Sequence, residues 1–259
     1  AADGKTDLYG NIYRPSTFDA ALKYPVIDAI YPGPYAIRTR KTFMGAVFDP
    51  AQALAELGFI VVTLDGRGTP FRSKAFHNNS YGRMEEVGNL QDHMAVLEQL
   101  GKRHPYIDLS AVGIVGHSGG GTAAVRAILQ YPEFYKVAVS SAGAHDKSGY
   151  VVATGTTYQG PYSPEKYAPM NNANLAANLQ GKLLLAHGDL DDNVHPAHTM
   201  RLVDALVKAN KDFDMLFLPN ATHVFSGVET YFSRKKWDYF ITHLKGGTPP
   251  KNYQILGPK

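Results

Sequence analysis

The run Val112-Gly113-Ile114-Val115-Gly116-His117-Ser118-Gly119-Gly120-Gly121 carries the strongest signal in the chain for fold and chemistry together. It opens with a short apolar segment, residues 112–115, which predicts a buried strand. Apolar side chains recur at helical spacing over the residues that follow, 120–130. A strand, a tight glycine turn and a helix are the setting that a Gly-x-Ser-x-Gly nucleophile turn requires. The run therefore predicts a strand-to-helix turn with Ser118 as nucleophile at its tip.

The glycines of this run have a physical role in that interpretation. Side chains at Gly116 or Gly120 would collide with neighbouring elements, and the amide of Gly119 can point at a developing oxyanion. Two alternative interpretations are compatible with the glycines alone. One is a glycine-rich turn with an incidental serine, and the other is phosphate binding. The glycine spacing does not match a dinucleotide fingerprint, and no lysine follows as in a P-loop.

Strand and helix patterns alternate outward from this turn. The predicted strands are 8–13, 25–30, 59–64, 112–115, 136–140, 182–186 and 214–218, and the predicted helices are 50–57, 90–100, 120–130, 196–209 and 231–244. Near-continuous apolar strands are typical of parallel sheets covered on both faces. We expect one α/β domain over residues 1–259, with a mostly parallel central sheet and helices on both faces.

Two segments depart from this alternation. Residues 144–178 are rich in Gly, Pro, Asn, Tyr and Thr and show little helical or strand period. We expect them to form a loop-rich insertion over the active site, since long irregular segments in compact domains are often functional. The tail, 246–259, is expected to run over the surface.

A serine nucleophile needs a base, and in this type of fold the acid and then the histidine follow the serine along the chain. A predicted strand ends at a glycine turn that is followed by Asp189, Asp191 and Asp192. The last predicted strand is followed by His223 in a loop. The acid would hold the tautomer of the imidazole and stabilise its cation.

The composition and the spacing of the remaining residues bear on other functions. His195 and His198 beside the aspartates resemble a metal cluster, but Pro196 marks an ordinary helix start, so we expect no metal and no cofactor. Cysteine is absent, which excludes thiol chemistry. The charge balance of 26 basic to 23 acidic residues favours no nucleic acid partner. No apolar run approaches the length of a membrane span.

Several motifs in one order resemble the catalytic domain of the prolyl oligopeptidase family, most closely its dipeptidyl-peptidase-IV-like branch. They are Tyr24-Pro25 with Ile30-Tyr31-Pro32-Gly33-Pro34, Asp65-Gly66-Arg67-Gly68-Thr69, the serine turn, His187-Gly188 with Asp191-Asp192-Asn193-Val194, and His223. The resemblance runs from about residue 8 to residue 255. It implies an α/β-hydrolase fold and a periplasmic or secreted protein.

The resemblance also implies roles for particular residues. Ser118, Asp191 and His223 would form the catalytic triad, with Asp191 chosen because it is the first aspartate of the Asp-Asp-Asn pattern. Tyr31 would donate its hydroxyl to the oxyanion beside the Gly119 amide. The pocket for the side chain before the scissile bond would be lined by Val194, Tyr150 and Tyr158.

Two departures from the family pattern limit what can be carried over. Relatives usually carry an N-terminal β-propeller, and its short, regularly spaced strands are not found in this sequence; the chain is either an excised catalytic domain or propeller-free. Gly119 stands where many dipeptidyl relatives have a tyrosine.

The predicted activity is cleavage of short peptides by a serine peptidase through an acyl-enzyme. The alternative is a carboxylesterase with an open site on the same triad, and a third hypothesis is a non-catalytic binding module on a hydrolase scaffold. The substrate is expected to be a small peptide or ester.

Overall fold

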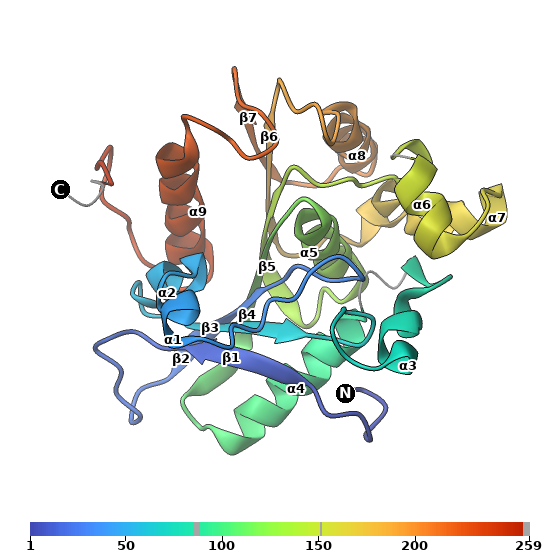
Figure 1. Cartoon of the computed structure of the whole chain (residues 1–259). Coiled ribbons are helices and arrows are strands. Elements are labelled where there is room, and N and C mark those ends of the chain that lie inside the picture. The colour runs from blue at the N-terminus through green and yellow to red at the C-terminus, as the bar shows by residue number, and fades with distance from the viewer. Residues whose placement is uncertain (85–88, 151, 256–259) are drawn as a thin grey trace.

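The computed structural model describes residues 1–84, 89–150 and 152–255 (Figure 1). Its centre is a seven-stranded sheet with the order β1-β3-β2-β4-β5-β6-β7. Only β1 is antiparallel to its neighbour, and all other pairs are parallel. The strands are β1 Tyr9–Tyr13, β2 Tyr24–Ala29, β3 Ile60–Asp65, β4 Ile107–His117, β5 Tyr135–Ser141, β6 Lys182–Gly188 and β7 Asp214–Leu218. Every strand predicted from the sequence is therefore present.

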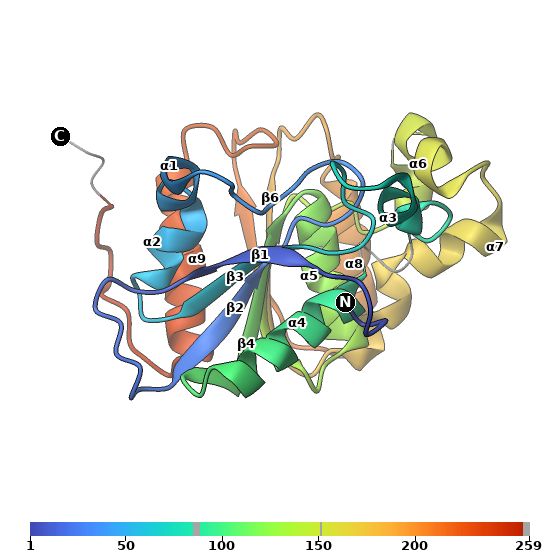
Figure 2. The ribbon, with the colours of Figure 1, turned by 60° about the horizontal axis from the view of Figure 1, so that its bottom comes forward.

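Helices cover both faces of this sheet, as predicted (Figure 2). One face packs against α4 (Leu90–Arg103), α5 (Gly119–Gln130) and α8 (Ala197–Lys208). The other packs against α2 (Pro50–Ala55) and α9 (Glu229–His243). Because both faces are covered, β3 is buried at every position, which explains why its sequence is mostly apolar.

Strand β4 is longer than predicted, because it begins at Ile107 rather than at residue 112. The polar side chains of Asp108 and Ser110 interrupt the apolar pattern there, and Asp108 Oδ1 accepts a hydrogen bond from the Ser110 amide at 2.9 Å. The register with β2 shifts between Pro25 and Val26. Because of this irregularity, a prediction based on continuous apolar residues does not find the first part of the strand.

The predicted insertion, 144–178, connects the end of β5 to the start of β6 and contains short helices. They are η3 Lys147–Gly149, α6 Val152–Gln159, α7 Pro164–Tyr167, η4 Ala168–Met170 and η5 Asn172–Asn178. Helices this short show too few turns to reveal a period. Figure 1 places α6 and α7 at one flank of the molecule, beyond α5. Further short helices, α1 Phe43–Val47, α3 Lys74–His77 and η1 Asn78–Ser80, were also not predicted.

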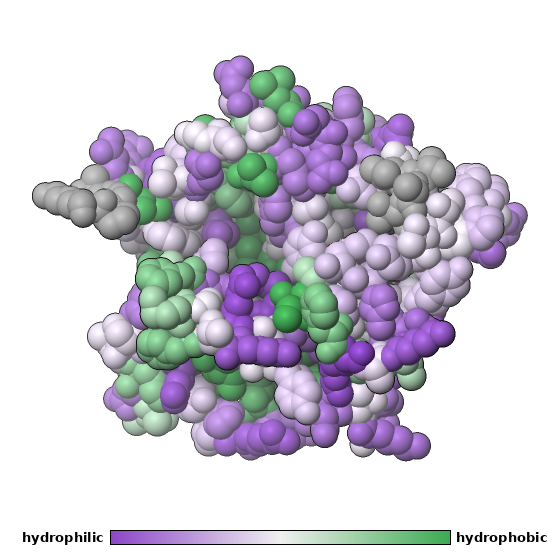
Figure 3. Space-filling view, in the orientation of Figure 1, coloured by the Kyte–Doolittle hydropathy of each residue, from purple (hydrophilic) through white to green (hydrophobic). Residues whose placement is uncertain are grey.

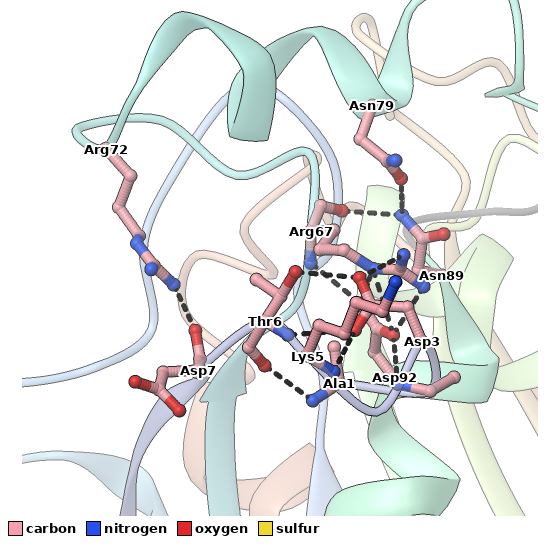
Figure 4. A network of polar contacts seen from close by, with 11 residues as sticks. Ala1, Asp3, Lys5, Thr6, Asp7, Arg67, Arg72, Asn79, Asn89 and Asp92 are labelled. Atoms are coloured by element: carbon pink, nitrogen blue, oxygen red, sulfur yellow. Dashed lines mark hydrogen bonds and ion pairs between the residues drawn. The ribbon is translucent and has the colours of Figure 1, made fainter.

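The turn after β3 is fixed to α4 by a polar network (Figure 4). Arg67 Nη2 lies 2.9 Å from Asp92 Oδ1, and its Nη1 lies 3.0 Å from Asp3 Oδ2. Asn89 Nδ2 donates to the Arg67 carbonyl at 2.6 Å and to Asn79 Oδ1 at 2.9 Å. The loop held in this way extends to Gly82, whose amide donates to the Tyr158 carbonyl at 2.7 Å, so it also supports α6.

Residues 246–255 of the tail are largely exposed and form no helix or strand, while 256–259 lie outside the described residues. Among the helices of the described residues, none combines the length and apolar character needed to cross a membrane.

Candidate active site

Ser118 lies at the turn between β4 and α5, at the carboxyl edge of the sheet. Its backbone has φ 56° and ψ −120°, a conformation that costs energy for a residue with a side chain. The turn is held in place because the Ser118 amide donates to the Ser141 carbonyl at the end of β5, at 2.8 Å. The sequence thus produces the strained strand-to-helix turn that was expected from its glycines.

The glycines on either side make this turn sterically feasible. A Cβ on Gly116 would lie 2.1 Å from the Gly120 carbonyl oxygen, and a Cβ on Gly120 would lie 2.3 Å from the Ile30 carbonyl oxygen. A Cβ on Gly121 would lie 2.5 Å from the Ser141 carbonyl oxygen. Because these contacts are with backbone atoms that cannot move aside cheaply, only glycine fits at the three positions.

Tyr31 and Gly119 meet beside the serine. A Cβ on Gly119 would lie 3.8 Å from Tyr31 Cζ and 3.9 Å from its hydroxyl oxygen. Gly119 is the first residue of α5, so its amide has no carbonyl partner within the helix. A hydroxyl donor and a backbone donor therefore flank the position in front of Ser118, as an oxyanion hole requires.

Asp191 and His223 form a hydrogen-bonded pair, with His223 Nδ1 donating to Asp191 Oδ2 at 2.8 Å. Asp191 is buried, and its Oδ1 accepts from the amides of Asn193 and Val194 at 3.0 and 2.8 Å. The ring centroid of His223 lies 4.9 Å from that of His117, the residue before Ser118. The chain brings the predicted acid and base together beside the predicted nucleophile.

The other aspartates of the acid loop do not share this environment. Asp189 and Asp192 are both exposed. His195 is exposed too, and its Nδ1 accepts from the Ala197 amide at 3.1 Å at the start of α8. Among the residues that the structure describes, no group of three or more His, Asp or Glu side chains is arranged to hold a metal ion.

His187 supports the acid loop directly. It is fully buried, and its Nε2 lies 2.8 Å from the Val194 carbonyl and 3.2 Å from Asp191 Oδ2. Both neighbours only accept hydrogen bonds, so Nε2 carries the proton, and Nδ1 accepts from Thr199 Oγ1 at 2.7 Å. Burial lowers the pKa of His187, which holds it neutral in one tautomer, and its Nε2 contacts the same Asp191 oxygen, Oδ2, that accepts from His223.

The residues predicted to bind the acyl side of the substrate gather near this loop. Tyr150 donates its hydroxyl to Asn193 Oδ1 at 3.2 Å, and Val194 is buried. Tyr158 packs edge-on against Tyr35 with ring centroids 5.1 Å apart. Partial burial raises the pKa of Tyr35, and Tyr158, Tyr150 and Tyr31 are close enough to add to that effect. The tyrosines therefore form one cluster beside the predicted oxyanion donors.

Two residues of the site were not predicted as functional. Lys147 lies over the Tyr150 ring with its Nζ 5.0 Å from the centroid, and burial lowers its pKa to about 8. His117 Nδ1 lies 3.0 Å from Ser141 Oγ; burial, followed by the neighbouring His223, lowers the pKa of His117 to about 4. His117 is therefore neutral at neutral pH and adds no charge beside His223. Its place in the serine turn was the available sequence signal.

Comparison with known proteins covers most of the chain. The sequence model of the prolyl oligopeptidase family matches residues 47–247. Dipeptidyl peptidase 8 of Homo sapiens is 34% identical over 83% of this chain, which corresponds to 24% of that protein. A probable dipeptidyl-aminopeptidase B of Arthroderma benhamiae is 31% identical over 81% of this chain and 23% of its own length. The chain thus spans about a quarter of the length of these relatives.

Solved structures with dipeptidyl peptidase names also superpose on most of the chain. The crystal structure of a putative dipeptidyl aminopeptidase IV from Bacteroides ovatus superposes with a TM-score of 0.88 at 33% identity, covering 94% of this chain and 35% of that one. Porphyromonas gingivalis dipeptidyl peptidase 4 has a TM-score of 0.84 at 28% identity, covering 92% and 34%. Together with the mostly parallel sheet, these neighbours confirm the predicted α/β-hydrolase fold.

Proposed function

Because the chain belongs to the prolyl oligopeptidase family, we propose that it is the catalytic part of a serine peptidase that cleaves short peptides through an acyl-enzyme. The proposal extends to dipeptidyl-peptidase-like cleavage, since the relatives carry that name. The observation that carries it is the 2.8 Å Asp191–His223 hydrogen bond beside the strained turn of Ser118.

The proposed reaction follows from this arrangement. Ser118 Oγ attacks the scissile carbonyl carbon while His223 Nε2 takes the hydroxyl proton. Asp191 stabilises the imidazolium, and Tyr31 with the Gly119 amide stabilises the oxyanion. His223 then gives its proton to the departing amine, which leaves an ester on Ser118. Water deprotonated by His223 hydrolyses this ester, and Ser118 regains its proton.

The acyl group of the substrate would lie against Val194, Tyr150 and Tyr158. We do not include strict specificity for proline, because the space over Gly119 is open in this chain. The nearest atom to a Cβ at that position is 3.8 Å away. A side chain packed on a proline ring would have to stand there.

The proposal is tested with purified chain and two chromogenic substrates. One is a Gly-Pro or Ala-Pro anilide with an unblocked amino terminus, and the other is a short-chain nitrophenyl ester. Ser118→Ala is the blank for both, and we expect cleavage of the anilide that this variant abolishes. Cleavage of the ester alone would replace the peptidase with the carboxylesterase alternative. If neither substrate is cleaved, the catalytic proposal fails and the binding-module hypothesis gains support.

A further inference from the structure

A cavity of about 390 Å³ lies next to the serine turn, on the face of the sheet covered by α2 and α9. Its apolar wall includes Leu54, Phe225 and Phe232, and His117 and Tyr31 border it on the side of Ser118. Figure 3 shows a hollow with hydrophobic residues inside, to the right of the segment labelled α9 in Figure 1. The cavity therefore adjoins the candidate active site through Tyr31 and His117, and neither Tyr150 nor Val194 lines it.

One charged side chain in this cavity has no counter-ion. The Lys236 ammonium lies 5.5 Å from the centre of the Phe232 ring, and within the described residues no carboxylate lies within ion-pair distance of it. Of the other charges, Arg38 is paired with Asp49 at 3.3 Å, and Glu229 is exposed. Burial lowers the pKa of Lys236 to about 8, so it remains mostly protonated at neutral pH. An apolar cavity with an uncompensated cation attracts an anion.

A second polar atom in the cavity wall also lacks a partner. Ser141 Oγ donates to the Gly116 carbonyl at 3.3 Å, so His117 Nδ1 donates to Ser141 Oγ and Nε2 keeps a lone pair. This buried Nε2 has no hydrogen-bond partner among the described residues. It can accept one N–H, for example from a peptide group.

The position of the cavity identifies which half of a substrate reaches it. In the proposed reaction His223 gives its proton to the leaving group, so that group lies on the His223 side of Ser118. Val224 and Phe225 follow His223 directly in the chain, and both line the cavity. The acyl half lies on the other side, against Tyr150 and Val194.

We propose that this cavity binds the leaving-group half of the substrate and that Lys236 binds a carboxylate on that half. The inference rests on the proposed function and adds a substrate class to it, namely substrates with an anionic leaving group. The carboxylate can be the terminal one of a short peptide or an acidic side chain. His117 Nε2 would accept the N–H of the same segment. Charge-assisted hydrogen bonds in a water-poor pocket are stronger than neutral ones.

The first experiment uses the peptide Gly-Pro-Gly-Gly as the acid and as the C-terminal amide. We expect wild-type kcat/KM to be about tenfold higher for the acid, which corresponds to one charged hydrogen bond of moderate strength. Lys236→Met should remove this preference, and Lys236→Arg should keep it. Lys235→Met, on the same helix, is the matched control and should also keep it.

Three further measurements separate the outcomes. A melting curve of Lys236→Met, compared with that of Lys235→Met, shows whether the variant is folded, and its rate on a Gly-Pro anilide is the reference for a neutral leaving group. Peptide amides with Asp or Asn after the cleaved bond test a side-chain carboxylate as the source. If no peptide is cleaved at all, the proposed function has failed, and acetyl esters of 4-hydroxybenzoate and of its amide test Lys236 separately.

Equal rates for acid and amide in wild type, together with equal rates for the Asp and Asn peptides, would overturn the inference. A preference that survives Lys236→Met would overturn the role of Lys236.

Discussion

Within the described residues, two aspartate–histidine contacts through Nδ1 have nearly the same length but lie in very different surroundings. His223 Nδ1 lies 2.8 Å from Asp191, and His93 Nδ1 lies 2.9 Å from Asp28. The side chain of His223 is 16% exposed, whereas that of His93 is 1% exposed. Asp28 also accepts from the buried Tyr135 hydroxyl at 3.2 Å. The second pair joins β2 to α4 inside the core, away from the serine.

A hydrogen bond of this kind is therefore not sufficient for the role proposed for His223, which also needs access to a substrate. His223 stands beside the serine turn with part of its ring open to solvent, so it can exchange a proton with a substrate. His93 has no such access, and its pair can only contribute to folding. We therefore expect the two pairs to respond in opposite ways to substitution.

The largest effect is expected from the partly exposed pair of Asp191 and His223, here called the outer pair. His223→Gln should lower kcat by a factor of about 10⁴ or more, because the base of the proposed reaction is removed. Its thermal unfolding temperature should stay close to wild type, since the side chain is partly exposed. Anilide hydrolysis and a melting curve on the same preparation measure both quantities. A variant that keeps one tenth of the activity would rule out His223 as the base.

The pair of Asp28 and His93 in the core, here called the inner pair, should affect stability rather than activity. His93→Leu leaves the Asp28 carboxylate buried without a cation, which should cost about 3–5 kcal/mol in the free energy of unfolding. Urea unfolding measures this cost, and kcat of the folded fraction should be unchanged. The double variant with Asp28→Leu should be more stable than His93→Leu alone, because a buried pair replaced as a whole leaves no unpaired charge. A single variant within 1 kcal/mol of wild type would contradict this view of the pair.

A smaller effect is expected at Thr199, which contacts the outer pair only through His187. Thr199→Val removes the hydroxyl that donates to His187 Nδ1, so His187 is no longer held in the orientation that supports Asp191. We expect kcat to fall about tenfold with little change in KM, because the acid and base lose alignment while the binding surface remains. Steady-state kinetics with the anilide give both constants. An unchanged kcat would show that the contact between His187 and Asp191 has no part in alignment.

The smallest expected effect is the pH dependence of the inner pair. Burial by itself would lower the pKa of His93, but the charge of Asp28 and the hydrogen bond to it outweigh burial and raise the pKa. A histidine whose pKa is higher in the folded state stabilises the protein fully below its unfolded pKa, about 6.5. This contribution is lost as the pH rises through the folded pKa.

The difference in unfolding free energy between wild type and an Asp28→Asn, His93→Gln variant should therefore shrink as the pH is raised from mildly acidic to alkaline. A difference that stays constant would mean that the pKa of His93 is the same in the folded and unfolded states, and a difference that grows with pH would mean that folding lowers this pKa.

The sequence predicted the sheet because its strands are buried on both faces and leave continuous apolar runs. It predicted the serine turn because three glycines there are required by backbone contacts. It did not predict the inner pair, since His93 and Asp28 are 65 positions apart and neither stands in a motif. The cavity of Lys236 was also missed, because it depends on how α9 packs against α2. The short helices of 144–178 were not predicted, because no apolar period develops over so few residues.

The serine turn has a consequence for the evolution of specificity. Three of its glycines are fixed by backbone contacts, so drift at Gly116, Gly120 or Gly121 would be eliminated by selection for folding. Gly119 faces open space instead, with Tyr31 as its nearest neighbour. It is the position in the turn where a new side chain could arise without disturbing the nucleophile. A library of substitutions at Gly119 is thus a direct way to change which substrates this scaffold accepts.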